Sequence, residues 1–153
     1  MRLFRLCRQR YAELTGYGAK RTGGRWNRKG ISALYTAEHA SLAVVEVLVH
    51  LDRTEIPSDF VFLEVSVADE YILTLPTAES SEEFLKRVYQ TGAEALPPSI
   101  VGFSVPSVVV PQDRVVVLYS DAPLHATAVQ AAAITPFAFD PRLFTTQDYL
   151  VFG

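Results

Sequence analysis

The 153-residue sequence has few of the side chains on which secreted and metal-dependent domains rely. Cys7 is its only cysteine, which excludes an internal disulfide and a cysteine-rich zinc site. The three histidines, His39, His50 and His125, do not have the spacing of metal ligands, so we expect no metal. No apolar run reaches the roughly 18 residues that cross a bilayer. Arginines also interrupt the apolar start of the chain, unlike a signal peptide. We therefore expect a cytoplasmic protein without membrane contact.

Acidic residues are scarce at the start of the chain. The net charge is −3, yet residues 1–30 contain seven arginines, two lysines and one acidic residue, a balance of +8. Such a segment can bind a phosphate-bearing ligand or an acidic partner, or its arginines can pair with the acidic remainder. Nucleic acid ranks last, because the chain as a whole is acidic and carries no nucleic-acid-binding signature.

The composition and the spacing of apolar residues predict one globular domain. Apolar residues make up 49% of the chain and charged residues 20%, which is typical of a domain with a core. Short apolar or alternating runs predict strands at 2–6, 32–35, 60–67, 101–105, 108–110 and 114–119, with a break at Pro106-Ser107. A first helix is expected at about 36–51, with Thr36 as its N-cap and Glu38 in its first turn, and a second helix at 81–89.

Other segments are less regular. Residues 15–24 contain four glycines and read as a loop, residues 128–134 fit either a strand or a short helix, and residues 137–143 are expected to pack as an aromatic tail. Regular alternation of strands and helices is absent. The fold class predicted is therefore α+β, with a single domain over residues 1–153, a mixed or antiparallel sheet and flanking helices.

Glu46 is the unusual residue of the first helix. Every other residue from Leu42 to Val49 is apolar, so we expect the helix to be embedded on most sides. Burying an ionised carboxylate without a partner costs several kcal/mol or more. Either Glu46 is the solvent-facing residue of this helix, or it lies in a cleft with partners. Arg25 and Tyr35, which lie upstream, are the candidate partners.

Ser107 follows Pro106 at a break between two predicted strands. A serine hydrolase using His125 or His50 is conceivable, but the Gly-x-Ser-x-Gly elbow is absent and a preceding proline is the wrong context. The alternative is a simple turn residue. Arg5, on the first strand, is either exposed or faces a site.

Four polar residues suit dinucleotide chemistry. An arginine such as Arg25 can grip a diphosphate through its planar fork. The ring of Tyr35 can stack on nicotinamide, and the carboxylate of Glu46 can stabilise an oxocarbenium ion as a glycosidic bond breaks. Ser107 can orient either Glu46 or the ribose. Composition and spacing permit this chemistry without singling it out.

Five segments together resemble the RES domain, a family named for a recurring Arg, Glu and Ser. They are Gly-Gly-Arg-Trp-Asn-x-x-Gly at 23–30, Leu-Tyr-Thr-Ala at 34–37, Leu-Ala-x-x-Glu-Val-Leu-Val-His-Leu at 42–51, Val-Pro-Ser-Val-Val-Val-Pro at 105–111 and Pro-Phe-x-Phe-Asp-x-Arg-Leu-Phe at 136–144. The match covers nearly the whole chain in the expected order. One departure is Ser120 to His125, where members often have Asn-Pro-x-His, which puts a cleft-shaping asparagine in doubt.

The resemblance implies the toxin of a bacterial type II toxin–antitoxin pair with a fold similar to ADP-ribosyltransferases. Such toxins consume NAD as a substrate, by hydrolysis or phosphorolysis in some members and by ADP-ribosylation of a protein in others. The usual partner is an Xre-like helix-turn-helix antitoxin that covers the active-site cleft, and a homo-oligomer within that complex is a further expectation. A non-catalytic, antitoxin-binding co-repressor is the non-enzyme alternative.

Individual positions follow from the same resemblance. Arg25, Tyr35, Glu46 and Ser107 match the catalytic residues. Gly24, Trp26 and Asn27 match the surrounding motif, and together with Arg25 and Tyr35 they are expected to bind NAD. Arg5 is added to the NAD-binding residues from its place on the first predicted strand and not from the resemblance.

Overall fold

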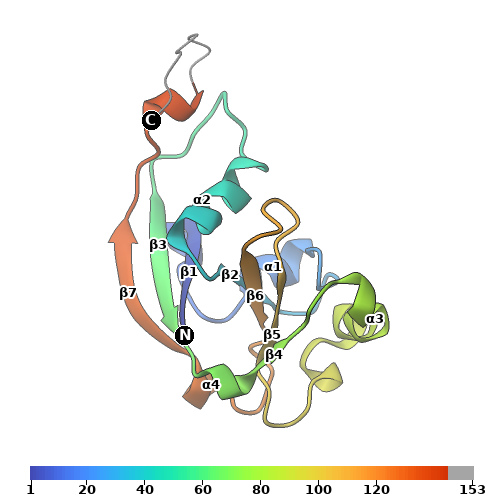
Figure 1. Cartoon of the computed structure of the whole chain (residues 1–153). Helices are drawn as coiled ribbons and strands as arrows, with labels where there is room; N and C mark the ends of the chain where they lie inside the picture. The colour runs from blue at the N-terminus through green and yellow to red at the C-terminus, as the bar shows by residue number, and fades with distance from the viewer. Residues whose placement is uncertain (145–153) are drawn as a thin grey trace.

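Seven strands form one mixed sheet in the computed structural model, which describes residues 1–144 (Figure 1). In spatial order the strands are β4 (Ile72–Thr74), β5 (Gly102–Pro106), β6 (Arg114–Leu118), β2 (Leu34–Ala37), β1 (Arg2–Arg8), β3 (Phe60–Ser66) and β7 (Gln130–Pro136). Only β4 and β5 run parallel to one another, and the other neighbours are antiparallel. The predicted α+β class with a mixed sheet is thus confirmed. The last residues of the predicted domain, 145–153, lie outside the described part.

Four α-helices accompany the sheet (Figure 1) in residues 1–144: α1 (Tyr17–Thr22), α2 (Ala40–Leu48), α3 (Glu82–Thr91) and α4 (His125–Ala128). Short 3₁₀ helices occupy Gln9–Tyr11, Asp69–Tyr71, Glu79–Ser81, Gly92–Ala95 and Pro141–Phe144. Within residues 1–144 no helix has the length and apolar character needed to cross a bilayer.

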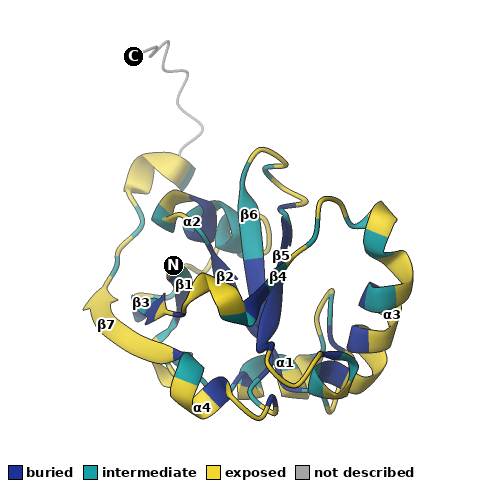
Figure 2. Cartoon of the chain, turned by 60° about the horizontal axis from the view of Figure 1, so that its bottom comes forward, coloured by how far each residue is buried: buried dark blue, intermediate teal, exposed yellow. Residues whose placement is uncertain are grey.

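The core follows from the alternation of side chains along the central strands. On β6, Val116 and Leu118 pack into one cluster, while Val117 packs into a second cluster together with Leu85 and Val88 of α3. This is the period of two that a strand buried on both faces requires. Figure 2 shows the buried residues concentrated along β5 and β6, under the surrounding helices and loops.

The helix that carries Glu46 differs from the prediction at its start. Thr36 does not cap it: Thr36 is buried in β2, and its hydroxyl donates to the Val116 carbonyl at 2.7 Å. The helix begins only at Ala40, after His39, and Glu38 precedes it. Pairing of β2 with β6 continues as far as Ala37, so these residues cannot turn into a helix earlier.

The same helix is also less buried than its sequence predicts. Leu42 and Ala43 are buried in a cluster with Leu6 and Phe60, but the remaining valines of α2 are only half-buried and Val49, after it, is 51% exposed. The prediction of a helix embedded on most sides was wrong, because α2 packs on the sheet with one side only.

Three segments of less regular sequence, and one predicted strand, have a definite structure. The glycine-rich loop at 15–24 contains the short helix α1, which Gly16 and Gly23 flank with φ angles of 69° and 73°. Residues 108–110 form a turn and not a strand. For the 128–134 segment the strand alternative is confirmed, since Gln130–Pro136 form β7; only Ala128, the last residue of α4, is helical. The aromatic tail is confirmed, since Phe137 packs edge-on against Phe62 with ring centroids 4.9 Å apart.

Gly102→Ala should strongly destabilise the fold. A Cβ at this position would lie 2.1 Å from the Val117 carbonyl oxygen, so β5 and β6 would have to separate. We expect a loss of about 3 kcal/mol, at the upper end of ordinary overpacking. Gly18→Ala is the matched control: its Cβ would meet only Tyr11 at 3.7 Å, and the free energy of unfolding should stay within about 1 kcal/mol of wild type. Urea denaturation measures both. Equal stability of the two variants would contradict this account of the β5–β6 pair.

Candidate active site

A cleft of about 950 Å³ lies between the glycine-rich segment, strands β1 and β2, helix α2 and the turn that joins β5 to β6. Its volume falls at the upper end of the range for small-molecule sites. Three arginines and one carboxylate line it, which gives its wall a positive balance. The charged or titratable lining side chains are Arg5, Tyr11, Arg21, Arg25, Tyr35, Glu46 and His50.

The Gly23–Asn27 turn that presents Arg25 is organised from beneath by Asn27. This side chain is fully buried, and its amide nitrogen donates to the carbonyls of Ala19 at 2.8 Å and Ile31 at 2.7 Å. Its backbone carbonyl accepts from the Gly24 N–H at 2.8 Å. A Cβ on Gly24 would lie only 2.8 Å from the Asn27 amide oxygen, so the turn requires glycine there.

The Tyr35 hydroxyl ties this turn to β2. It donates to the Asn27 amide oxygen at 2.7 Å and accepts from the Trp26 N–H at 2.8 Å. The Trp26 carbonyl in turn accepts from the Tyr119 hydroxyl at 2.8 Å. Burial raises the pKa of Tyr35 to about 12, so the phenol is neutral at physiological pH. Because its hydroxyl is occupied, Tyr35 offers the cleft its ring.

Arg25 and Arg5, two of the arginines that line the cleft, differ in exposure and in their hydrogen-bond partners. Arg25 is exposed, makes no ion pair within residues 1–144, and lies over the Trp26 ring with its guanidinium carbon 5.2 Å from the centroid. Arg5 is half-buried; one terminal nitrogen donates to the Tyr35 carbonyl at 3.3 Å, and its buried Nε has no partner in the described chain. Both guanidinium groups therefore keep donors available for an anionic ligand.

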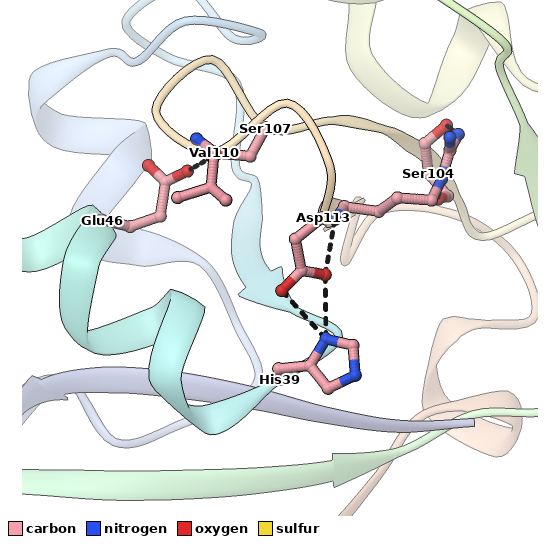
Figure 3. Close-up of polar contacts among 7 residues, drawn as sticks. His39, Glu46, Ser104, Ser107, Val110 and Asp113 are labelled. Carbon is pink, nitrogen blue, oxygen red and sulfur yellow. Dashed lines mark hydrogen bonds and ion pairs between the residues drawn. The ribbon is translucent and has the colours of Figure 1, made fainter. Parts of the chain in front are cut away.

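The carboxylate of Glu46, on α2, meets the hydroxyl of Ser107, just after β5, behind the wall of the cleft (Figure 3). The Ser107 hydroxyl donates to Glu46 Oε1 at 2.6 Å, and its oxygen accepts the N–H groups of Val109 at 3.1 Å and Val110 at 3.0 Å. Ser107 is only 2% exposed and does not line the cleft. Its one proton and its acceptor capacity are committed, so it can hold the carboxylate but is not presented as a nucleophile.

Comparison with known proteins identifies the family of the chain. The family model for the RES domain matches residues 2–140. The chain belongs to the RES domain family. Toxin Res of Yersinia enterocolitica is 36% identical to it, over 94% of this chain and 99% of that protein. Prs ADP-ribosylating toxin of a Sphingobium species is 30% identical, over 86% of each protein.

A solved structure supports the fold. A chain in the M. tuberculosis MbcT–MbcA toxin–antitoxin complex superposes on this RES domain with a TM-score of 0.63 at 21% sequence identity. The match covers 94% of this chain and 86% of that chain. At this level of identity the similarity concerns the fold alone.

The predicted site residues take two kinds of position in this RES domain. Arg5, Gly24, Arg25, Trp26, Tyr35 and Glu46 all line the cleft. Asn27 and Ser107 lie behind its wall, where Asn27 supports the turn and Ser107 supports Glu46. The expected pairing of Glu46 with Arg25 or Tyr35 is not present in the described structure: the carboxylate bonds to Ser107 instead. The three residues share the cleft without contacting one another through polar groups.

Other wall residues were not predicted. Arg21 follows from the basic start of the chain only once α1 is known, and Val108 and Val109 line the cleft because residues 108–110 turn instead of continuing a strand. His50, considered for a hydrolase, does line the cleft. His125 does not: its Nε2 lies 3.0 Å from the Leu14 carbonyl, and burial lowers its pKa. The Ser120 hydroxyl similarly donates to the Thr15 carbonyl at 2.6 Å.

Tyr35→Phe should change how stability depends on pH. An unfolded tyrosine titrates near pH 10, whereas burial raises the pKa of Tyr35 to about 12. Between these values the unfolded chain loses its proton first, so the free energy of unfolding falls as pH rises. The contribution of Tyr35 is about 2–3 kcal/mol.

Wild type should therefore lose more stability between pH 10 and 12 than Tyr35→Phe, which lacks this titration. Denaturation at several pH values measures the difference, and Tyr119 is unchanged in both proteins. Parallel curves for the two proteins would contradict the buried environment assigned to Tyr35.

Proposed function

We propose that this RES domain is the toxin of a toxin–antitoxin pair and that it breaks the bond between nicotinamide and ribose in NAD. The observation that carries the proposal is one cleft lined both by Glu46, whose carboxylate accepts a hydrogen bond from Ser107, and by Arg5 and Arg25, which keep donors available. Membership of the RES family and the toxin names of its relatives support the biological role.

NAD fits the chemistry of the wall. Its diphosphate needs cationic donors, and Arg5, Arg21 and Arg25 all line the cleft. Its nicotinamide needs a flat surface, and the ring of Tyr35 is the part of that residue left for the ligand. Gly24 allows the backbone to approach closely, while Trp26 borders the same region.

Glu46 has the central role in the proposed reaction. As the bond between ribose C1′ and the pyridinium nitrogen breaks, nicotinamide leaves with the electron pair and positive charge develops on the ribose. A fixed carboxylate stabilises that charge more in the transition state than in the substrate. Water then attacks C1′ and releases one proton to the solvent, or a phosphate anion attacks C1′ and forms a sugar phosphate without proton release. Ser107 orients Glu46 and does not itself react.

A second acceptor is a protein side chain. The relative from Sphingobium is named Prs ADP-ribosylating toxin, and it shares 30% identity with this chain. The same cleft would then transfer ADP-ribose to protein. Labelled NAD separates the two cases, because hydrolysis or phosphorolysis leaves the label in small molecules and transfer leaves it on protein.

Glu46→Gln should abolish nicotinamide release while the protein stays folded. Glutamine keeps an acceptor for Ser107 but removes the negative charge that stabilises the ribosyl cation, so we expect a loss of about 100-fold or more in turnover. Chromatographic detection of nicotinamide after mixing with NAD measures it. Glu83→Gln, an exposed change on α3, is the matched control and should keep wild-type turnover.

Growth arrest should follow the same pattern on expression of these variants. Full toxicity of Glu46→Gln, or no nicotinamide from wild type with water, phosphate or cell extract as the acceptor source, would refute the NAD-cleaving role.

We also propose an Xre-like helix-turn-helix antitoxin that covers the cleft. The cleft has one apolar lip, with Val49 51%, Val108 58% and Val109 37% exposed, and a basic lip with Arg21 and Arg25. A covering partner must therefore present apolar residues to one lip and acidic residues to the other.

Val108→Asp should weaken binding of the cognate antitoxin by about tenfold or more, because it places a charge in an apolar contact. Titration calorimetry measures the affinity. Ile134→Asp, a change of equal chemistry at a 52% exposed site on β7, is the control and should bind like wild type. Equal affinities for wild type and Val108→Asp would contradict a partner seated on this lip.

A further inference from the structure

The turn between β5 and β6, residues 107–113, is tied to α2 at two places (Figure 3). One tie is the Ser107–Glu46 hydrogen bond already described. The other joins Asp113, at the end of the turn, to His39, the residue that precedes α2. The two ties are seven residues apart along α2, about two helical turns, so together they fix the turn along the length of the helix.

The turn is also closed on itself. The Ser107 N–H donates to the Asp113 carbonyl at 2.8 Å, and the Asp113 N–H donates to the Val110 carbonyl at 2.9 Å. The Ser107 hydroxyl collects the N–H groups of Val109 and Val110. A continuous chain of hydrogen bonds therefore connects Asp113 to Ser107, and Ser107 to Glu46.

The second tie has a defined geometry. His39 Nδ1 lies 2.9 Å from both carboxylate oxygens of Asp113, and since these only accept, Nδ1 is the donor. Asp113 Oδ1 also accepts the Arg114 N–H at 2.7 Å. The Asp113 side chain is 19% exposed and that of His39 66%, so the pair closes the turn from its outer side.

We propose that His39 and Asp113 are positioning residues for the NAD-cleaving reaction, which act on Glu46 through the 107–113 turn and the Ser107 hydroxyl. The inference rests on the proposed function. Neither residue lines the cleft. The two elements that they join do line it, through Val49 and His50 just after α2 and through Val108 and Val109 of the turn. The pair thus sets both the orientation of the carboxylate and the relative position of two walls of the cleft.

An ordinary surface ion pair would behave differently. Such pairs contribute little to stability, and breaking one changes no turnover. The Arg8–Asp59 pair provides the comparison, since its side chains are 35% and 38% exposed and neither lines the cleft. Asp59→Asn therefore serves as the matched control.

Kinetics of nicotinamide release test the proposal with the full-length chain. His39→Ala should lower kcat by about tenfold, the scale expected from a small misplacement of a reacting group, with KM within about threefold of wild type. His39→Asn, whose side-chain amide can replace the Nδ1 donor, should recover most of kcat. In a Ser107→Ala background, His39→Ala should add less than about a twofold further loss, because the path to Glu46 is already broken. Asp59→Asn should keep wild-type kcat.

Amide hydrogen exchange supplies a readout that does not depend on catalysis. The N–H groups of Val109 and Val110 should exchange about tenfold faster in His39→Ala than in wild type, and near the wild-type rate in His39→Asn. Asp113→Asn should resemble His39→Ala in both assays. If Asp113→Asn does not fold, the His39 variants alone still decide the matter.

Unchanged exchange and kcat in His39→Ala would overturn the proposal, as would an equal loss of kcat in the Ser107→Ala background. If wild type releases no nicotinamide, the proposed function fails. Exchange at Val109 and Val110 then decides separately whether His39 holds the turn, so the two failures are distinguishable.

Discussion

The shape of the cleft depends most on the two hydrogen bonds of the Tyr35 hydroxyl, one to the Asn27 amide oxygen and one from the Trp26 N–H. They link β2, in the middle of the sheet, to a glycine-rich turn that has little apolar surface of its own. The amide oxygen of Asn27 accepts from Tyr35, and its amide nitrogen donates to the carbonyls of Ala19 and Ile31. These hydrogen bonds fix the turn that carries Arg25. Breaking one of them leaves a buried polar group unsatisfied, which costs about 1–3 kcal/mol.

The opposite wall depends on a different principle. Glu46 lies on a helix that packs on the sheet with one side, so its carboxylate is fixed by Ser107 and not by burial alone. The two walls come from elements that are distant in the sequence and that the central strands bring together. A cleft lined by arginines and by a fixed carboxylate suits a ligand with a diphosphate at one end and a developing cation at the other.

The sequence predicts well what local pattern controls. The predicted strands at 60–67 and 114–119 and the predicted helix at 81–89 are present close to those limits. Each of these patterns buries its apolar residues on one face with only one kind of secondary structure. Of the candidate site, the segments were recognisable but their internal contacts were not. The bond between Glu46 and Ser107 joins residues 61 apart in sequence. The complete burial of Asn27 and the partial exposure of α2 depend on packing that no local pattern contains.

A crystal structure of Glu46→Gln with NAD bound is the most direct test of the central claim, that Arg25, Tyr35 and Glu46 surround one dinucleotide. The account predicts the nicotinamide ribose beside residue 46, nicotinamide against the Tyr35 ring and the diphosphate on Arg25 or Arg5. NAD bound outside this cleft, or bound in it with its nicotinamide ribose remote from residue 46, would contradict the account.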